Sequence, residues 1–382
     1  MPRTDENRLD ALVVGAGVIG LACAWRAAQR GLRVAVVDRE APGSGTTRVA
    51  AGMLAPIGEA SWGEEALLDL NLASARLFPG FCVELERASG VDVGYRRCGG
   101  LHVALDRDEA EELRHRHELH LSLGLEAQWL RPRPARELEP GLATAITAAV
   151  HAADEGEVDP NALVAALVAA LERAGVELIV GDEVVEALVE GDRLVGVVTA
   201  KGRRLSSASV VLASGWSSGR SPWLPPHARP PVRPVKGQIL TLKGQAVEPL
   251  CERIVATQRV YVVPRADGRV VIGATVEERG PDLTVTAGGV HELLREAYRV
   301  LPEIAELELT AAVAGLRPAT LDNAPVIGPG ALDGLVLATG HFRNGILLAP
   351  VTADAVAALL AGDEPTALAA RFAAERFERA VA

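Results

Sequence analysis

Three glycines near the start of the chain have the spacing of a dinucleotide-binding turn. The motif GAGVIG (15–20) follows an apolar run, and Asp38 ends the next apolar run. Gly15 and Gly17 permit a tight turn in which the backbone approaches a pyrophosphate, and Gly20 lets the following helix touch the strand. Asp38 can accept hydrogen bonds from an adenosine ribose, which disfavours NADP. The motif therefore predicts dinucleotide binding, but it does not separate FAD from NAD.

Two further segments favour FAD over NAD. Thr46 and Thr47 offer hydroxyls to a pyrophosphate, and the small residues of AAGM (50–53) let the chain lie against a broad ring. The stretch TGHFRNGI (339–346) precedes an expected helix, whose free N-terminal amides suit the N1 and C2-carbonyl edge of a flavin. Read alone, the first segment is equally a flexible surface loop, and the second is equally an ordinary strand-to-helix turn.

The elements that must position these residues alternate as in an α/β protein. An apolar strand over 11–14, a glycine turn, a helix over 19–30 and a strand over 34–37 make one βαβ unit. The Arg-Pro-Arg-Pro segment 131–134 indicates a break. Further helices are expected over about 64–88, 106–123, 161–173 and 345–360, and further strands over 101–105, 177–180, 184–189, 194–199, 210–213 and 335–338.

A proline-rich segment indicates a second domain. Six prolines fall within 221–234, and alternating strands are expected after it, over 238–242, 260–263, 270–272 and 308–315. We predict an α/β plus α+β protein, in which a discontinuous Rossmann-like FAD-binding domain is joined to a second, antiparallel-sheet substrate domain. The predicted ranges are 1–87, 145–220 and 315–382 for the first domain, and 88–144 and 221–314 for the second.

Composition excludes several function classes. The 382 residues include 39 basic and 50 acidic side chains, a net charge of −11, and the arginines are scattered, so we expect no nucleic-acid partner. No apolar run reaches the roughly 20 residues of a membrane span, and no signal peptide is evident, so we expect a cytoplasmic protein. The four cysteines and the histidines of RHRHELH (114–120) lack metal-site spacing, so we expect reduced thiols, a solvated helix and no metal.

Together these segments resemble the D-amino acid oxidase superfamily, and within it the glycine oxidases of thiamin biosynthesis. The resemblance covers nearly the whole chain, and its most specific piece is GHFRNGILLAP (340–350). With the motif glycines, it implies contacts to non-covalent FAD at Gly15, Gly17, Val18, Ile19, Gly20, Asp38, Arg39, Thr46, Thr47, Ala51, Gly52, Met53, Val184, His341, Phe342, Arg343, Asn344, Gly345, Ile346 and Leu347.

The resemblance also implies a substrate site and an activity. Arg317 and Tyr261 would hold a substrate carboxylate, with Arg343 contributing, because a guanidinium fork matches a carboxylate and a phenol adds a directional donor. Two positions depart from the glycine oxidase pattern near the pocket: Val276 stands in place of a methionine and Arg259 in place of a histidine. The resemblance therefore fixes the amino-acid oxidase class better than it fixes glycine.

The implied reaction is oxidative deamination of glycine, with sarcosine or small D-amino acids as further substrates. Dioxygen would be the second substrate, and the products would be the imino acid or 2-oxo acid, ammonia and hydrogen peroxide. Because the motifs contain no evident general base, we expect direct hydride transfer from the α-carbon. The resemblance implies a role in thiamin thiazole biosynthesis and a homo-oligomer, a tetramer in the resembling enzymes. The alternatives are a sarcosine or broader D-amino acid oxidase, and a dehydrogenase that passes electrons to a carrier.

Overall fold

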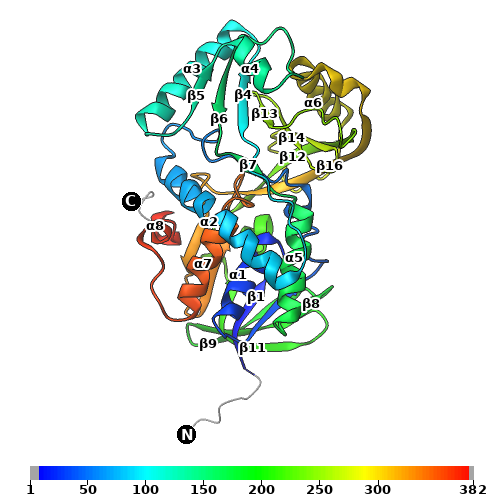
Figure 1. The fold of residues 1–382 in the computed structure, drawn as a ribbon. Helices are drawn as coiled ribbons and strands as arrows, with labels where there is room; N and C mark the ends of the chain where they lie inside the picture. The colour runs from blue at the N-terminus through cyan, green and yellow to red at the C-terminus, as the bar shows by residue number, and fades with distance from the viewer. Residues whose placement is uncertain (1–7, 378–382) are drawn as a thin grey trace.

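The computed structural model describes residues 8–377, which form two lobes, each built on one large sheet (Figure 1). The lower lobe contains the glycine-rich N-terminal turn, and the upper lobe contains the proline-rich region's downstream strands. The ends of the predicted first domain, 1–7 and 378–382, lie outside the described residues. The mixed α/β architecture with a second, mainly antiparallel sheet confirms the predicted fold class.

The sheet of the lower lobe is parallel at its centre, and its strands come from both ends and the middle of the chain. β1 pairs in parallel with β2 and β11, β2 pairs in parallel with β8, and β11 pairs in parallel with β18. The path order is β17-β18-β11-β1-β2-β8, with β10 and β9 attached in antiparallel fashion to β11. The strands are β1 (Leu9–Val14), β2 (Val34–Asp38), β8 (Glu177–Val180), β9 (Val184–Glu190), β10 (Arg193–Thr199), β11 (Arg204–Leu212), β17 (Val326–Pro329) and β18 (Leu335–Thr339).

The glycine-rich turn brings the first helix against the sheet. Gly15 has a φ of +114°, and a Cβ there would lie 2.4 Å from the carbonyl oxygen of Ala213. A Cβ on Gly20, in the first turn of helix α1 (Val18–Gln29), would lie 1.9 Å from the carbonyl oxygen of Gly15. The structure thus shows the close approach of helix and strand that the glycine spacing predicts.

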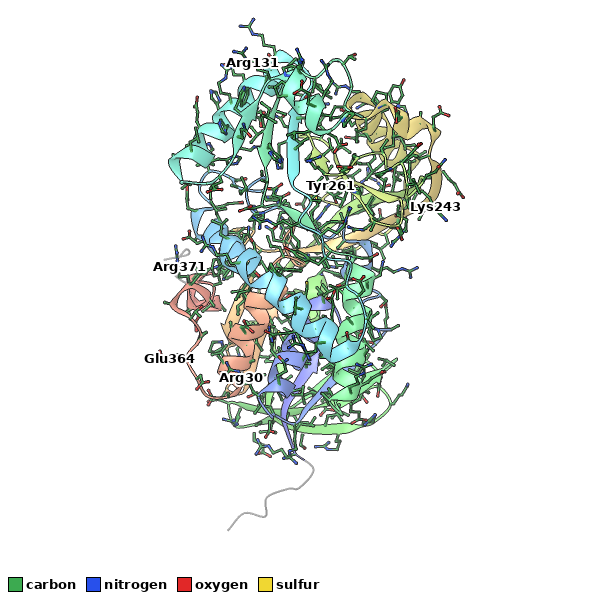
Figure 2. All side chains as sticks on the ribbon, in the orientation of Figure 1. Arg30, Arg131, Lys243, Tyr261, Glu364 and Arg371 are labelled. Carbon is green, nitrogen blue, oxygen red and sulfur yellow. The ribbon has the colours of Figure 1, made fainter. Side chains whose placement is uncertain are left out.

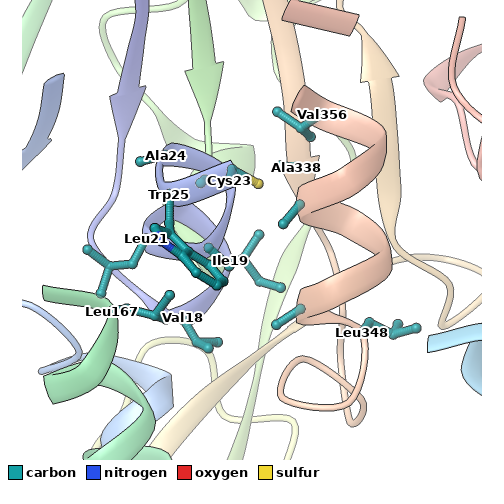
Figure 3. Packing of buried hydrophobic residues seen from close by; sticks show 14 of the residues in the cluster. Val18, Ile19, Leu21, Cys23, Ala24, Trp25, Leu167, Ala338, Leu348 and Val356 are labelled. Carbon is teal, nitrogen blue, oxygen red and sulfur yellow. The ribbon is translucent and has the colours of Figure 1, made fainter. Parts of the chain in front are cut away.

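Helices cover one face of this sheet. Helix α1 packs between α5 (Pro160–Arg173) and α7 (Ala349–Leu360), and α2 (Glu65–Ser89) crosses over both neighbours. Figure 3 shows Trp25, Leu167 and Val356 reaching into the shared apolar core from these three helices. The Trp25 ring meets the edge of Phe81 from α2 at a centroid distance of 5.1 Å. Burying these large side chains supplies the main stabilisation of the lobe.

Helix α2 is long and apolar enough to cross a membrane by length and composition alone. It packs on α5 and α7, and 44% of its most apolar window is buried inside the protein. A core helix of a globular protein passes the same test, so this helix is weak support for a membrane span.

The upper lobe is built on an eight-stranded sheet in the order β16-β12-β15-β14-β13-β4-β6-β5. All neighbours are antiparallel except β13 and β4. Its strands are β4 (Gly100–Ala104), β5 (Gln128–Leu130), β6 (Ala148–Ala152), β12 (Arg233–Lys243), β13 (Ile254–Ala256), β14 (Tyr261–Pro264), β15 (Arg269–Gly273) and β16 (Glu308–Ala319). The helices α3 (Arg107–Ser122), α4 (Pro132–Leu138) and α6 (Ala287–Val300) accompany it.

The remaining elements are short. The strands β3 (Met53–Leu54) and β7 (Gly156–Glu157) pair with each other. Single turns and short helices complete the chain: η1 (Thr46–Val49), η2 (Gly215–Arg220), η3 (Pro226–Ala228), η4 (Pro302–Glu306), α8 (Ala367–Ala370) and η5 (Ala374–Phe377). With respect to the predicted domain ranges, β6 lies in the upper sheet although 145–220 is assigned to the first domain, and β16 continues past 315.

Three local expectations were wrong. The segment 131–134 does not break the chain but opens α4, because proline is favoured in the first turn of a helix, where its missing N–H costs nothing. Helix α7 begins at Ala349 rather than at about 345. His120 is fully buried in α3 instead of solvated, and this burial lowers its pKa to about 4.

Candidate active site

A cavity of about 580 Å³ runs from the carboxyl ends of the lower sheet to the strands β12, β14 and β16 of the upper sheet. It brings together residues that are more than 300 positions apart in the sequence. Of the residues predicted to contact FAD or substrate, those that line it are Gly15, Gly17, Val18, Ile19, Asp38, Arg39, Thr46, Thr47, Ala51, Gly52, Met53, Val184, Tyr261, Arg317, His341, Phe342, Arg343, Gly345 and Ile346.

Three predicted contact residues do not line the cavity. Gly20 lies behind the turn, where it lets α1 approach β1. Asn344 is 9% exposed, and its N–H donates to the carbonyl of His341 over 3.0 Å. Leu347 is buried, and its carbonyl accepts a 2.6 Å hydrogen bond from the hydroxyl of Ser74. These three residues lie behind the residues that line the cavity.

The N-terminal end of the cavity has the groups that a nucleotide requires. The carboxylate of Asp38 accepts hydrogen bonds from the backbone N–H groups of Ala16, over 2.6 Å, and Glu40, over 2.9 Å. The hydroxyl oxygen of Thr47 accepts a 3.1 Å hydrogen bond from the N–H of Val18, which leaves the hydroxyl proton available to an anion. Because the turn precedes the N-terminus of α1, its amides and the helix dipole favour a pyrophosphate here.

The small-residue segment 50–53 is fixed rather than flexible. Gly52 has a φ of +70°, and a Cβ there would lie 2.0 Å from the carbonyl oxygen of Val158. The buried Arg265 donates to the carbonyl of Ala51 and forms an ion pair with the equally buried Glu157. Burial lowers the pKa of Arg265 to about 10, so its guanidinium remains charged near neutral pH. No sequence motif pointed to this ion pair.

The C-terminal side of the cavity is a turn, not the first turn of a helix. The N–H of Leu348 donates to the carbonyl of Asn344 over 2.8 Å, and Phe342 adopts a φ of +45°. Among residues 8–377 the backbone N–H groups of Gly345 and Ile346 have no hydrogen-bond acceptor, and both residues line the cavity. Unpaired donors in a partly buried turn suit the electron-rich edge of a flavin. The flavin contact of this segment stays a prediction, while its predicted helical geometry is wrong.

Tyr261 and Arg317 meet at the far end of the cavity because glycines on neighbouring strands leave space for them. A Cβ on Gly237 of β12 would lie 2.4 Å from the Arg317 guanidinium, and a Cβ on Gly273 of β15 would lie 2.3 Å from the Tyr261 ring. Tyr261 lies on β14 in the upper lobe (Figure 2). Burial raises the pKa of its phenol, so the hydroxyl keeps its proton and donates it.

The two arginines of this end differ in their partners. The Arg317 guanidinium donates to the carbonyl of Thr275 over 3.1 Å and forms no ion pair with any described residue. Arg343 pairs with Glu59 over 3.3 Å and approaches Glu64 at 3.7 Å. Arg317 is therefore a cation of this end without an ion-pair partner among the described residues, whereas Arg343 is already compensated by the protein. Glu59 lies in a loop with no recognisable motif, and sequence reasoning missed it.

Several other side chains lie outside this site. Lys236 is fully buried and does not line the cavity, and it pairs with Asp282 over 2.9 Å and Glu277 over 3.6 Å. The side chains of Val276 and Arg259 do not line the cavity, and both are exposed. No group of three or more potential metal ligands occurs within the described part of the chain.

Residues 10–359 match the family model described as DAO, FAD dependent oxidoreductase, and the chain belongs to this family. Its cofactor is therefore FAD, which agrees with the turn amides, Asp38 and the ring-sized segment 50–53 around the cavity.

Within the family, the chain is 35% identical to the glycine oxidase of Geobacillus kaustophilus, and the alignment covers 93% of each chain. The crystal structure of glycine oxidase from Geobacillus kaustophilus superposes on this chain with a TM-score of 0.89. The superposition covers 97% of this chain and 99% of the other. It is 34% identical to the bifunctional protein ThiO/ThiG of Trichormus variabilis, covering 97% of this chain but only 55% of that protein. Iminodiacetate oxidase from Chelativorans is 26% identical, with a TM-score of 0.85 over 95% of this chain and 98% of the other.

One prediction for this site concerns the loss of folding stability at acidic pH. His341 is buried and lies 3.0 Å from the hydroxyl of Thr352 through its Nε2, and burial lowers its pKa to about 3. In the unfolded chain the His341 imidazole binds a proton as the pH falls below about 6.5, whereas in the folded protein it stays neutral down to about pH 3. The stabilisation is therefore complete above pH 6.5 and falls by up to about 1.4 kcal/mol per pH unit as the pH decreases toward 3.

Replacing His341 by glutamine removes this titration. Unfolding by urea at pH 7.5 and pH 5.5 should show a smaller loss of stability for His341→Gln than for the wild type, by about 1 kcal/mol. Equal pH dependence in both proteins would show that His341 is not held neutral.

Proposed function

We propose that this chain oxidises glycine, with sarcosine and small D-amino acids as further substrates. Glycine, dioxygen and water give glyoxylate, ammonia and hydrogen peroxide, through an imino acid that hydrolyses. The relatives named glycine oxidase and ThiO/ThiG support this proposal and a role in thiamin thiazole biosynthesis. The observation that carries it is the uncompensated Arg317 guanidinium beside the protonated Tyr261 phenol at one end of the cavity.

These two side chains bind and orient the substrate. The guanidinium fork holds the carboxylate, and the phenol donates a third hydrogen bond, so the α-carbon has one orientation relative to the cofactor. Bound FAD supplies the two-electron acceptor. Neither Arg317 nor the protonated Tyr261 is a base for the α-carbon proton, which is consistent with loss of hydride from a neutral amine. Arg317 and Tyr261 therefore contribute to the reaction by binding the substrate and fixing its orientation.

We also propose a cytoplasmic location, dioxygen as electron acceptor and a homo-oligomer. The four cysteines are all free, and three of them are buried, which suits a reducing compartment. Light scattering on the purified protein tests the oligomer, and a monomer would contradict it.

An anaerobic titration of the yellow holoenzyme with glycine tests the function. We expect the flavin absorption near 450 nm, a typical flavin band, to bleach at one equivalent of amine per flavin. Parallel assays with glycine, sarcosine and D-alanine then separate the alternatives. Bleaching without peroxide in air would identify a carrier-dependent dehydrogenase, and no bleaching by any of the three amines would contradict the proposal.

A further inference from the structure

Glu59 is a carboxylate built into the wall of the cavity at its substrate end. It lines the cavity, and its Oε2 lies 3.3 Å from Nε of Arg343. This oxygen is shielded from solvent, and no donor among residues 8–377 gives it a hydrogen bond. Glu59 is also close enough to Tyr261 to raise the pKa of the phenol. The carboxylate is therefore held near the place where a substrate carboxylate is expected.

The backbone beside Glu59 is fixed by a buried, hydrogen-bonded pair of side chains. The N–H of Gly58 donates to Oε1 of Glu155 over 2.6 Å, and Oε2 of Glu155 lies 3.0 Å from Nε2 of His102. Both side chains are buried, and a Cβ on Gly58 would lie 1.9 Å from the His102 ring. Because the loop is fixed at Gly58, the position of Glu59 is set by the fold and not by solvent.

The charges at this end of the cavity then decide how many substrate carboxylates are accepted. Arg317 lies beside Tyr261, and both Arg343 and its partner Glu59 line the same cavity. Glu59 occupies Arg343, so a single guanidinium, that of Arg317, remains for a substrate. A second substrate carboxylate would lie near Glu59 and would be repelled by it.

We propose that Glu59 determines the specificity of this site for monocarboxylate amines by neutralising Arg343. This inference rests on the proposed amine-oxidising function and adds its substrate class. Removing the charge of Glu59 leaves Arg343 with only the longer 3.7 Å contact to Glu64, so its guanidinium can bind a second carboxylate. The fold is compatible with such substrates, because iminodiacetate oxidase, whose named substrate carries two carboxylates, shares it.

Sarcosine and iminodiacetate make a matched pair for the test. Both are secondary amines derived from glycine, and they differ by one carboxylate on the nitrogen substituent. Iminodiacetate, dioxygen and water would give glyoxylate, glycine and hydrogen peroxide, with the carbon–nitrogen bond oxidised by two electrons and then hydrolysed. We expect Glu59→Gln to raise the ratio of kcat/KM for iminodiacetate over sarcosine about tenfold, the effect of one charge-assisted contact.

A binding measurement keeps the inference independent of turnover. Calorimetric titration of the holoenzyme with malonate and with acetate compares an inert dicarboxylate with an inert monocarboxylate. In Glu59→Gln the affinity for malonate relative to acetate should rise about tenfold. Adding Arg343→Gln to this variant should abolish the gain, because no second guanidinium is then left for malonate, and Arg343→Gln alone should not raise the ratio, because it leaves the Glu59 carboxylate uncompensated.

Glu64→Gln is the matched control. Glu64 also approaches Arg343, but it does not line the cavity, and its Oε1 accepts a 2.9 Å hydrogen bond from Asn323. We expect its malonate-to-acetate ratio to stay within about threefold of the wild type. An unchanged ratio in folded Glu59→Gln, or a gain that persists in the Glu59→Gln/Arg343→Gln double variant, would overturn the inference. If the wild type oxidises no amine, the proposed function fails, while the binding ratios still decide the role of Glu59.

Discussion

Replacement of Arg317 by leucine is expected to raise the KM for glycine by about 100-fold or more, since removing one member of a buried charge pair costs several kcal/mol. Arg317 is the cation of the site without an ion-pair partner among the described residues, so its loss leaves the substrate carboxylate opposite a leucine. FAD should stay bound, because the residues expected to hold the nucleotide line the other end of the cavity. Steady-state kinetics and the visible spectrum of the purified variant check both parts.

Two further variants make this result specific. Arg317→Lys keeps the charge but loses the two-pronged geometry, so its KM should lie between those of the wild type and Arg317→Leu. Arg259→Leu removes an exposed arginine that does not line the cavity, and it should behave as the wild type. If Arg317→Leu retained the wild-type KM, Arg317 would not bind the substrate carboxylate.

The second large effect is expected from Gly20→Ala. The added methyl group would lie 1.9 Å from the carbonyl oxygen of Gly15 and 3.2 Å from the Cβ of Ala213. Helix α1 would have to move away from β1, at a cost of about 1–3 kcal/mol of folding stability. Since the same turn presents amides to the pyrophosphate, we also expect most of the FAD to be lost on purification. Thermal unfolding and the ratio of visible to ultraviolet absorption measure the two effects.

Gly80→Ala is the matched control, because it makes the same substitution inside another helix. Gly80 is exposed on α2, and a Cβ there would have no neighbour within 4 Å. Alanine in a helix interior is more stable than glycine by about 0.5–1 kcal/mol, so this variant should be slightly stabilised and should keep its FAD. Similar behaviour of the two variants would show that contact between helix and strand is not what Gly20 provides.

The local sequence pattern was sufficient to predict the helices and strands where the periodicity of the chain agrees with its tertiary packing. The first βαβ unit lies where the sequence placed it, within a residue at each end of α1. The pattern was insufficient at 131–134, where prolines begin a helix, and at 345–348, where a turn precedes α7. In the second case two hydrogen bonds back to His341 and Asn344 hold a turn that local helix signals do not reveal.

The residues of the candidate site likewise include some that a sequence motif indicates and others that only the tertiary structure brings together. The turn glycines, Asp38 and the 339–346 segment could be predicted because their function depends on contiguous residues. Glu59 and the ion pair of Arg265 with Glu157 could not, since each depends on a partner about 100 or more positions away.

The sequence by itself determined the dinucleotide-binding turn and the two-sheet architecture. These follow from short-range spacing, because a tight turn and a strand's alternation are properties of neighbouring residues. That Arg317 holds a carboxylate is an expectation from the family resemblance. Only the tertiary structure decided which arginine is free. Arg343 is compensated by Glu59 and Arg317 is not. Charge balance depends on distances between segments that fold together from separate parts of the chain, and no local pattern encodes those distances.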